Sequence, residues 1–151
     1  MTLAHVGIGS NLDDPVRQVR AAFDELDRMP HTRVVKRSSL YRSAPLGHTE
    51  QPDFINAVAQ LETGLPAARL LAELQALETR HGRKRSFPNA PRTLDLDLLL
   101  FGNATLCSPA LTVPHPRMHE RAFVLKPLLE VSPELPFSLE ACAGQDVERI
   151  D

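Results

Sequence analysis

The alternation of hydrophobic and polar positions predicts strands and helices in turn along the first part of the chain. Residues 2–8 are typical of a strand, and apolar side chains then recur at helical spacing from Pro15 until Pro30 ends the pattern. Residues 33–41 contain the β-branched pair Val34-Val35 and end in Leu40-Tyr41, and both pairs favour a second strand. Residues 54–61 alternate between two sets of side chains, which predicts a third strand with two different faces.

A second helix and a fourth strand follow. The helix is expected to begin near Pro66 and to end at Gly82, and the strand lies within residues 92–102. The order β-α-β-β-α-β is the split βαβ pattern of ferredoxin-like α+β folds, in which two helices back one face of an antiparallel sheet. We therefore expect the other face to be open to ligands. Residues beyond 102 should add short strands and short helices to this core.

The fourth predicted strand carries two carboxylates inside an apolar run. Because alternate side chains of a strand share a face, Asp95 and Asp97 should point the same way, with Cα atoms about 6.6 Å apart. The positions expected to face the helices are Leu94, Leu96, Leu98 and Leu100. A solvent-exposed face is one interpretation, since most surface acids are simply exposed. A magnesium site is the other, because the acidic face continues into apolar Leu99 and Phe101, and Mg²⁺ commonly binds one or two carboxylates plus substrate phosphates.

Basic residues lie on both sides of the two acids in the sequence. They are Arg83, Lys84, Arg85 and Arg92 upstream, and His115, Arg117, His119 and Arg121 downstream. A solvated surface is the simpler interpretation of either cluster alone. Cations that bracket two carboxylates instead suit polyphosphate transfer, in which a metal bridges phosphate oxygens and arginines neutralise the remaining charge.

Three polar side chains fall at positions where a core-only role explains them poorly. Glu78 lies inside the apolar arc of the second predicted helix and Gln75 lies at its edge, so each is expected to have a structural hydrogen bond or a ligand. Asn56 shares a strand face with Phe54, which pairs an aromatic surface with an amide able to bind the edge of a heterocycle. A core role for Phe54 is the competing interpretation.

Composition narrows the class of protein. The 17 basic and 19 acidic residues nearly cancel, and the pI of about 6.3 indicates no general attraction to nucleic acid or anionic membrane. The two cysteines lie far apart and suit reduced thiols better than a disulfide or a zinc site. No P-loop or nucleophile-elbow motif occurs. We expect one soluble, cytoplasmic, monomeric domain spanning residues 1–151, with no nucleic-acid or membrane partner.

Several segments together resemble a known family. They are Gly9-Ser10-Asn11-Leu12, SSLYRSAPLGHTEQPDFINAV (38–58), Gly82-Arg83, PRTLDLDLLLFG (91–102) and VPHPRMHERAFVLKPLLEVSPEL (113–135). The set resembles the 6-hydroxymethyl-7,8-dihydropterin pyrophosphokinases of folate biosynthesis. The resemblance implies transfer of pyrophosphate from ATP to the hydroxymethyl group of the reduced pterin, with AMP as the other product.

The resemblance also implies roles for individual residues. Asp95 and Asp97 would hold two Mg²⁺ ions, and Arg83 and Arg92 would complete the catalytic set. The implied ATP-binding residues are Gln75, Glu78, Arg85, Arg92, Leu98, Thr112, His115 and Arg121. The implied pterin-binding residues are Ser43, Ala44, Leu46, Phe54, Asn56, Asp95 and Phe123. Two phenylalanines of that set, Phe54 and Phe123, would sandwich the ring.

The chain departs from the family pattern at two places, and two rival functions stay open. Many family members have a tryptophan in the basic loop, and this chain has none; Pro116 stands where some relatives have an aromatic residue. A metal-dependent phosphohydrolase or nuclease would use the same acids and arginines but would not need Phe54, Asn56 and Phe123. A non-enzymatic ferredoxin-like module that senses a nucleotide or binds RNA is the second rival.

Overall fold

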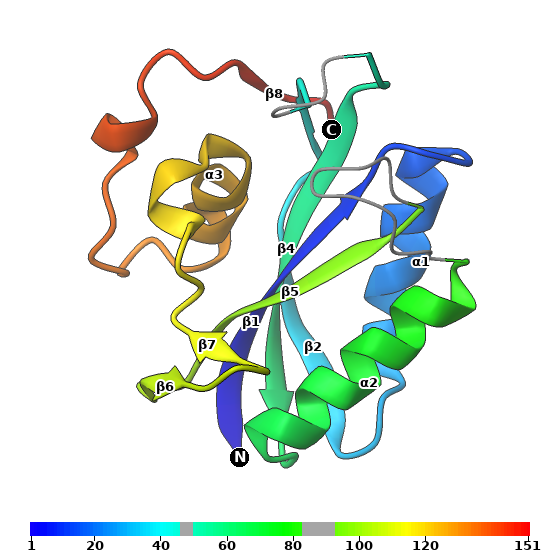
Figure 1. The fold of residues 1–151 in the computed structure, drawn as a ribbon, viewed down its shortest axis with the longest axis vertical. Coiled ribbons are helices and arrows are strands. Elements are labelled where there is room, and N and C mark those ends of the chain that lie inside the picture. Colours follow the sequence, from blue (N-terminus) through cyan, green and yellow to red (C-terminus); the bar gives the residue numbers. More distant parts are fainter. Residues whose placement is uncertain (46–49, 83–92) are drawn as a thin grey trace.

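The computed structural model describes residues 1–45, 50–82 and 93–151, and its first part has the predicted order of strands and helices (Figure 1). The elements are β1 (Thr2–Ser10), α1 (Pro15–Asp27), β2 (Thr32–Arg37), β3 (Tyr41–Ser43), β4 (Phe54–Thr63), α2 (Ala67–Arg80) and β5 (Asp95–Phe101). The strands pair antiparallel in the order β5-β1-β4-β3, with β8 (Val147–Arg149) beyond β3, and β2 also pairs with β4. The ferredoxin-like α+β fold is therefore confirmed.

The predicted second strand is two strands in the structure. β2 and β3 both pair with β4, and residues 38–40 separate them. At the break, the Ser38 hydroxyl accepts a hydrogen bond from the Val58 backbone N–H at 2.8 Å, while the Ser38 N–H donates to the Val58 carbonyl at 2.9 Å. The side chain thus takes over one position of the backbone ladder, which allows the chain to shift register before β3 begins.

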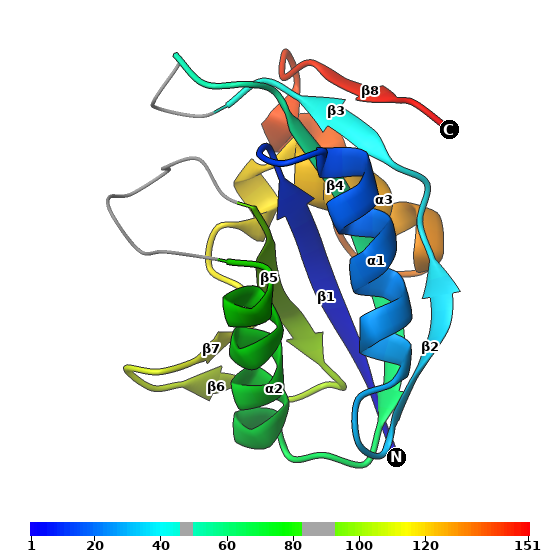
Figure 2. The same ribbon diagram turned by 90° about the vertical axis from the view of Figure 1, so that its right-hand side faces the viewer.

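Helices α1 and α2 pack side by side on one face of the sheet, as predicted (Figure 2). Each helix presents a stripe of apolar side chains at i, i+3 and i+4 spacing, which is the pattern that buries one side of a helix. The fully or nearly fully buried residues of these two stripes are Val19, Ala22, Phe23, Leu26, Leu70, Leu74 and Leu77. Ile55, Ala57, Ala59 and Leu61 of β4 meet them from the sheet, so the predicted alternation of that strand is confirmed.

The opposite face of the sheet is not open along its whole length, contrary to the expectation. The chain after β5 forms β6 (Leu106–Cys107), β7 (Thr112–Val113), a 3-10 turn (Met118–Glu120), α3 (Ala122–Val131), a second 3-10 turn (Leu139–Cys142) and β8 (Val147–Arg149). Helix α3 covers part of this face and builds a second apolar cluster with Val58 and Leu99 (Figure 1). The hydrophobic runs of residues 122–131 needed a surface to bury against, and the uncovered sheet supplies it.

A β-bulge in β5 overturns the expected orientation of its last residues. His5 pairs with Leu100 while Val6 pairs with Leu98, so β5 has one residue more than β1 between these two pairs. The extra residue changes the alternation: Leu94, Leu96 and Leu98 join the helix-side core, whereas Leu99 and Leu100 both join the α3 cluster, and Phe101 packs against the helix side. The prediction was therefore wrong for Leu100 and Phe101.

The C-terminal segment extends the sheet at the β3 edge. Ser43 of β3 pairs with Val147 of β8, and Leu40 is held by the Ile150 N–H and the Asp151 carboxylate at 2.9 and 2.7 Å. This strand lies beyond the segments on which the family resemblance rests. Across residues 1–45, 50–82 and 93–151, no helix is long and apolar enough to cross a membrane.

Candidate active site

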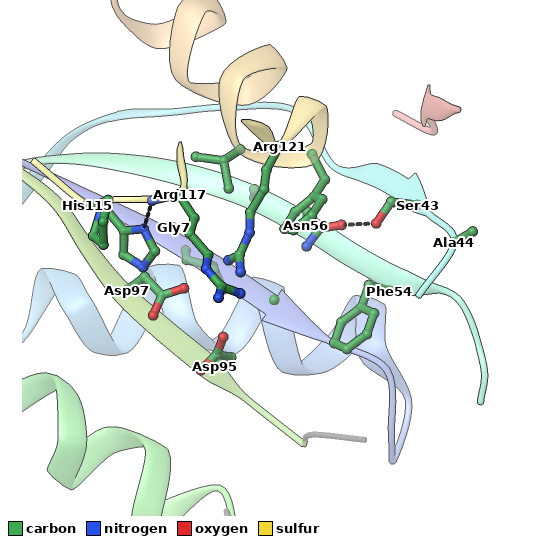
Figure 3. A pocket seen from close by; sticks show the side chains of 16 residues that line it. Gly7, Ser43, Ala44, Phe54, Asn56, Asp95, Asp97, His115, Arg117 and Arg121 are labelled. Carbon is green, nitrogen blue, oxygen red and sulfur yellow. Dashed lines mark hydrogen bonds between the residues drawn. The ribbon is translucent and has the colours of Figure 1, made fainter. Parts of the chain in front are cut away.

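A cavity of about 380 Å³ opens on the part of the sheet that α3 leaves uncovered, which is within the usual size of a small-molecule site (Figure 3). Strands β1, β3, β4 and β5 form its base, and the segment that leads into α3 forms one side. Its lining residues are Gly7, Ile8, Gly9, Ser43, Ala44, Phe54, Asn56, Ala57, Asp95, Asp97, His115, Pro116, Arg117, Arg121, Phe123 and Val124. Nine of these residues belong to the set that the resemblance implies.

Two glycines of the central strand keep the base of the cavity free of side chains. Gly9 pairs with Asn56 on one side and with Asp95 on the other, and Gly7 pairs with Asp97. A Cβ built on Gly9 would lie 3.2 Å from Asn56 Nδ2, which is closer than an ordinary van der Waals contact. Glycine inside a strand often marks a close approach of another group to the backbone, and here it lets a ligand lie flat between the amide and the acid.

The acidic wall of the cavity comes from the first residues of β5. Asp95 and Asp97 are both partly exposed, and Figure 3 shows their carboxylates on the cavity side of the strand. Among the residues that the structure describes, no group of three or more His, Cys, Asp and Glu side chains gathers to hold a metal. Two oxygen-donor side chains at one edge of a ligand cavity nevertheless fit Mg²⁺, which usually takes one or two carboxylates and fills its other positions with water and substrate phosphates.

Cationic side chains face the acids from the segment before α3. In Figure 3 the Arg117 and Arg121 side chains extend into the cavity above Asp95. Arg121 also lies over the Phe123 ring, with 5.6 Å from its Cζ to the ring centroid, a cation–π arrangement. The cavity is therefore positive on the α3 side and negative on the β5 side, which is the charge distribution that a metal–polyphosphate ligand needs.

His115 lies between these two sides and is held as a neutral ring. Burial lowers its pKa most, the Arg121 and Arg117 guanidinium groups lower it further, and Asp95 opposes them. The Arg117 backbone N–H donates to His115 Nδ1 at 3.2 Å, and the backbone N–H of His115 donates to the Leu99 carbonyl at 3.0 Å. With Nδ1 as an acceptor, the neutral ring carries its proton on Nε2 and can donate one hydrogen bond from that atom.

The other end of the cavity combines an aromatic ring with an amide. Phe54 and Asn56 stand on the same face of β4, as the alternation predicted, and Phe123 lines the cavity from α3. The Ser43 hydroxyl lies 2.6 Å from Asn56 Oδ1, and both side chains are buried. An aromatic surface beside a hydrogen-bonding amide suits a flat heterocycle, so the core interpretation of Phe54 is the weaker one.

Four residues with an implied ATP contact do not line this cavity. Glu78 is buried and accepts a hydrogen bond from the Leu96 backbone N–H at 2.8 Å, so the structural partner that its position called for is present. Leu98 is part of the helix-side core, Gln75 is exposed on α2, and Thr112 is on β7. Their contacts with ATP stay predictions.

The remaining implied residues lie outside the described part of the chain. They are Leu46, Arg83, Arg85 and Arg92. In the other direction, the cavity contains residues that the sequence argument did not assign to a site. Gly7 was visible as a glycine inside the predicted strand 2–8, which is itself a signal of close approach. Gly9 lay just beyond the predicted end of that strand, and the structure extends β1 through it to Ser10. Arg117 enters the sequence argument only as one member of a basic cluster, and its place in the cavity depends on how residues 113–121 cross the sheet.

Comparisons with known proteins indicate the family to which the chain belongs. A family profile described as 7,8-dihydro-6-hydroxymethylpterin-pyrophosphokinase (HPPK) matches residues 5–133. Proteins named 2-amino-4-hydroxy-6-hydroxymethyldihydropteridine pyrophosphokinase are similar: one from Pseudomonas aeruginosa is 47% identical over 97% of this chain and 95% of its own length, and one from Haemophilus influenzae is 46% identical over 89% and 84%.

Solved structures show the same fold. A structure described as HPPK-DHPS in complex with substrates superposes with a TM-score of 0.68 at 12% identity, over 91% of this chain. This chain corresponds to 41% of that longer one. Taken with the profile match and the identity to full-length relatives, the cavity of acids, arginines and an aromatic–amide end belongs to a protein of the 7,8-dihydro-6-hydroxymethylpterin pyrophosphokinase family.

Proposed function

We propose that the cavity is the site where this pyrophosphokinase brings ATP and 6-hydroxymethyl-7,8-dihydropterin together. The observation that carries the proposal is that Gly9 is the direct cross-strand neighbour of both Asn56 and Asp95, and that all three residues line one cavity. A heterocycle bound at the amide would therefore extend its side chain across the glycine toward the acids. A phosphohydrolase or nuclease has no need for that arrangement, and a nucleotide-sensing module has no need for acids beside the pterin end.

At the acidic end, Asp95 and Asp97 would hold Mg²⁺. The metal, when bound with ATP, would neutralise phosphate charge and make the β-phosphorus easier to attack. Arg121, Arg117 and the Nε2–H of His115 are the described donors that would bind phosphate oxygens. Residues outside the described part, Arg83, Arg85 and Arg92, are proposed to add further positive charge to the transferring group.

At the other end, the pterin ring would lie between Phe54 and Phe123. Asn56 would bind the polar edge of the ring, together with backbone groups of Ser43, Ala44 and Leu46. Stacking and edge binding together orient a flat ring and so direct its hydroxymethyl group toward the acids, which converts a bimolecular encounter into a positioned reaction.

The proposed chemistry is an in-line displacement. The hydroxymethyl oxygen forms a bond to the β-phosphorus of ATP, and the bond from that phosphorus to the oxygen shared with the α-phosphorus breaks, which releases AMP. In the same reaction the hydroxyl proton passes to the Asp97 carboxylate or to solvent water. The protein's own contribution is position and charge, with Asp95 and Asp97 on one side and guanidinium groups on the other.

An assay of AMP release tests the proposal. With ATP, Mg²⁺ and the hydroxymethyl pterin, the wild-type protein should release AMP, and leaving out the pterin should stop the release. Asp97→Ala should nearly abolish the reaction with the fold retained by circular dichroism. Asp24→Ala removes an exposed acid that pairs with Arg37 on the outside of α1 and should keep nearly full activity. Steady hydrolysis of ATP without the pterin would contradict the proposal and favour a phosphohydrolase.

A further inference from the structure

The hydrogen bond between Ser43 and Asn56 has a length that identifies its donor. The two side-chain atoms lie 2.6 Å apart, which is within the usual range for O–H···O bonds and below the usual range for N–H···O bonds. The Ser43 hydroxyl therefore donates, and the atom that accepts is the Asn56 oxygen. An amide has only one oxygen, so this bond also decides which end of the Asn56 side chain points away from Ser43.

The Asn56 nitrogen consequently faces the base of the cavity. Asn56 Nδ2 is the atom nearest to the position of a Cβ on Gly9, at 3.2 Å. Figure 3 shows the Asn56 oxygen joined to the Ser43 hydroxyl by a dashed hydrogen bond, and the Asn56 nitrogen on the side of the amide away from Ser43. A ligand edge that meets Asn56 at this point is offered N–H donors and has to supply an acceptor.

Ser43 is itself held firmly in the sheet. Its backbone lies between Phe54 of β4 and Val147 of β8 in the strand register, so it is paired on both sides. Its side chain is 5% exposed and that of Asn56 is 6% exposed. If the amide turned over, its nitrogen would meet the Ser43 oxygen and the hydroxyl proton would lose its acceptor, which is unfavourable because both side chains are buried.

We propose that Ser43 is a positioning residue that determines ligand specificity. Its hydroxyl holds the Asn56 amide in one orientation, and that orientation selects a ring with an oxo group over a ring with an amino group at the same position. The proposal rests on the proposed function, because it assigns Asn56 to the pterin edge. A 4-oxo pteridine offers an acceptor where Asn56 Nδ2 donates, whereas a 4-amino pteridine offers a donor there and would need the amide to turn over.

The experiment compares binding of a 4-oxo pteridine and its 4-amino analogue by titration calorimetry. The wild-type protein should prefer the 4-oxo compound. Ser43→Ala should reduce the ratio of the two affinities by about 2-fold to 10-fold, the range expected when one intramolecular hydrogen bond is lost. Ser43→Thr keeps the hydroxyl and should restore the wild-type ratio, whereas a purely structural role would change both affinities equally.

The Asn56→Ala variant tests whether Ser43 acts through Asn56. If Ser43 acts through Asn56, adding Ser43→Ala to Asn56→Ala should leave the ratio unchanged. A Ser43→Ala protein that keeps the wild-type ratio would overturn this inference while leaving the pterin site in place. A wild-type protein that binds neither pteridine would overturn the proposed function as well.

Discussion

Replacing Gly9 with alanine should weaken pterin binding because the new methyl group would project onto the base of the cavity. Gly9 stands between Asn56 and Asp95 in the sheet, and the added Cβ would lie 3.2 Å from Asn56 Nδ2 and 3.9 Å from Cδ1 of Phe54. Its backbone is outside the left-handed region, in contrast to Gly82, Gly102 and Gly144. Alanine can therefore adopt the same backbone, and the expected effect comes from occupied space alone.

The magnitude follows from how little the neighbours can move. Ordinary contacts of a Cβ lie at 3.4–4 Å, so the Asn56 amide would have to retreat by a few tenths of an ångström. Its oxygen is bound at 2.6 Å by Ser43, which opposes that movement. Overpacking of a well-packed site typically costs about 1–3 kcal/mol. Affinity falls by the part of this cost that falls on the complex, where the pterin and the Asn56 amide need the space of the new methyl group. The full cost corresponds to a loss of about 5-fold to 150-fold in affinity for the pterin.

Gly7→Ala is the matched control. Gly7 lies two residues earlier on the same strand and also lines the cavity, but its added Cβ would meet Leu99 at an ordinary 3.5 Å. The Kd for the pterin, measured by titration calorimetry, should rise in Gly9→Ala and stay within about 2-fold of wild type in Gly7→Ala, since an ordinary contact adds little cost. Equal Kd values for Gly9→Ala and wild type, or equal losses in both variants, would refute the close contact with Asn56 as the cause of the lost affinity.

Three further predictions follow from the same structure. Arg117→Ala should raise KM for ATP by about 5-fold to 20-fold with little change in KM for the pterin, because it removes one exposed charge-assisted contact. Arg117→Lys keeps the charge and should raise KM for ATP less. Equal KM values for ATP in Arg117→Ala and wild type would contradict this role. Burial lowers the pKa of His5 from 6.5, with Glu134 opposing, so the unfolded chain binds a proton more readily than the folded one and stability should fall as pH drops through 6.5. His5→Gln should flatten the decline in the urea midpoint between pH 7.5 and 5.5, and an unchanged slope would count against it. Deletion of residues 147–151 removes β8 from the β3 edge and should raise KM for the pterin more than KM for ATP, whereas equal changes would point to general destabilisation.

Much of the fold could be predicted from local patterns. The alternating residues of β4 and the spaced leucines of α2 each bury one side, and both orientations were confirmed. The same argument failed at Leu100 and Phe101, where a single extra residue in β5 reversed the alternation. A bulge depends on how two strands far apart in the sequence come into register, and a period-2 pattern within one strand contains no information about its partner.

Part of the candidate site could also be predicted from local spacing, and part of it could not. Asp95, Asp97, Phe54 and Asn56 stand on one face because of their spacing along two strands, and the cavity contains all four. The role of Glu78 as an acceptor for the Leu96 N–H was one of two open alternatives, since the sequence indicates a need for a partner and leaves its identity undecided.

The sequence by itself determined the alternation of strands and helices through β5, the buried faces of α1, α2 and β4, and the types of residue that line the cavity, because propensity, periodicity and residue type act over a few neighbouring residues. Only the tertiary structure decided that α3 covers part of the sheet, that Gly9 forms a bare base between Asn56 and Asp95, and that Ser43 orients an amide 13 residues away. The physical reason is that register and packing minimise the free energy of the whole chain, so the partner of a side chain depends on every other segment that competes for the same surface.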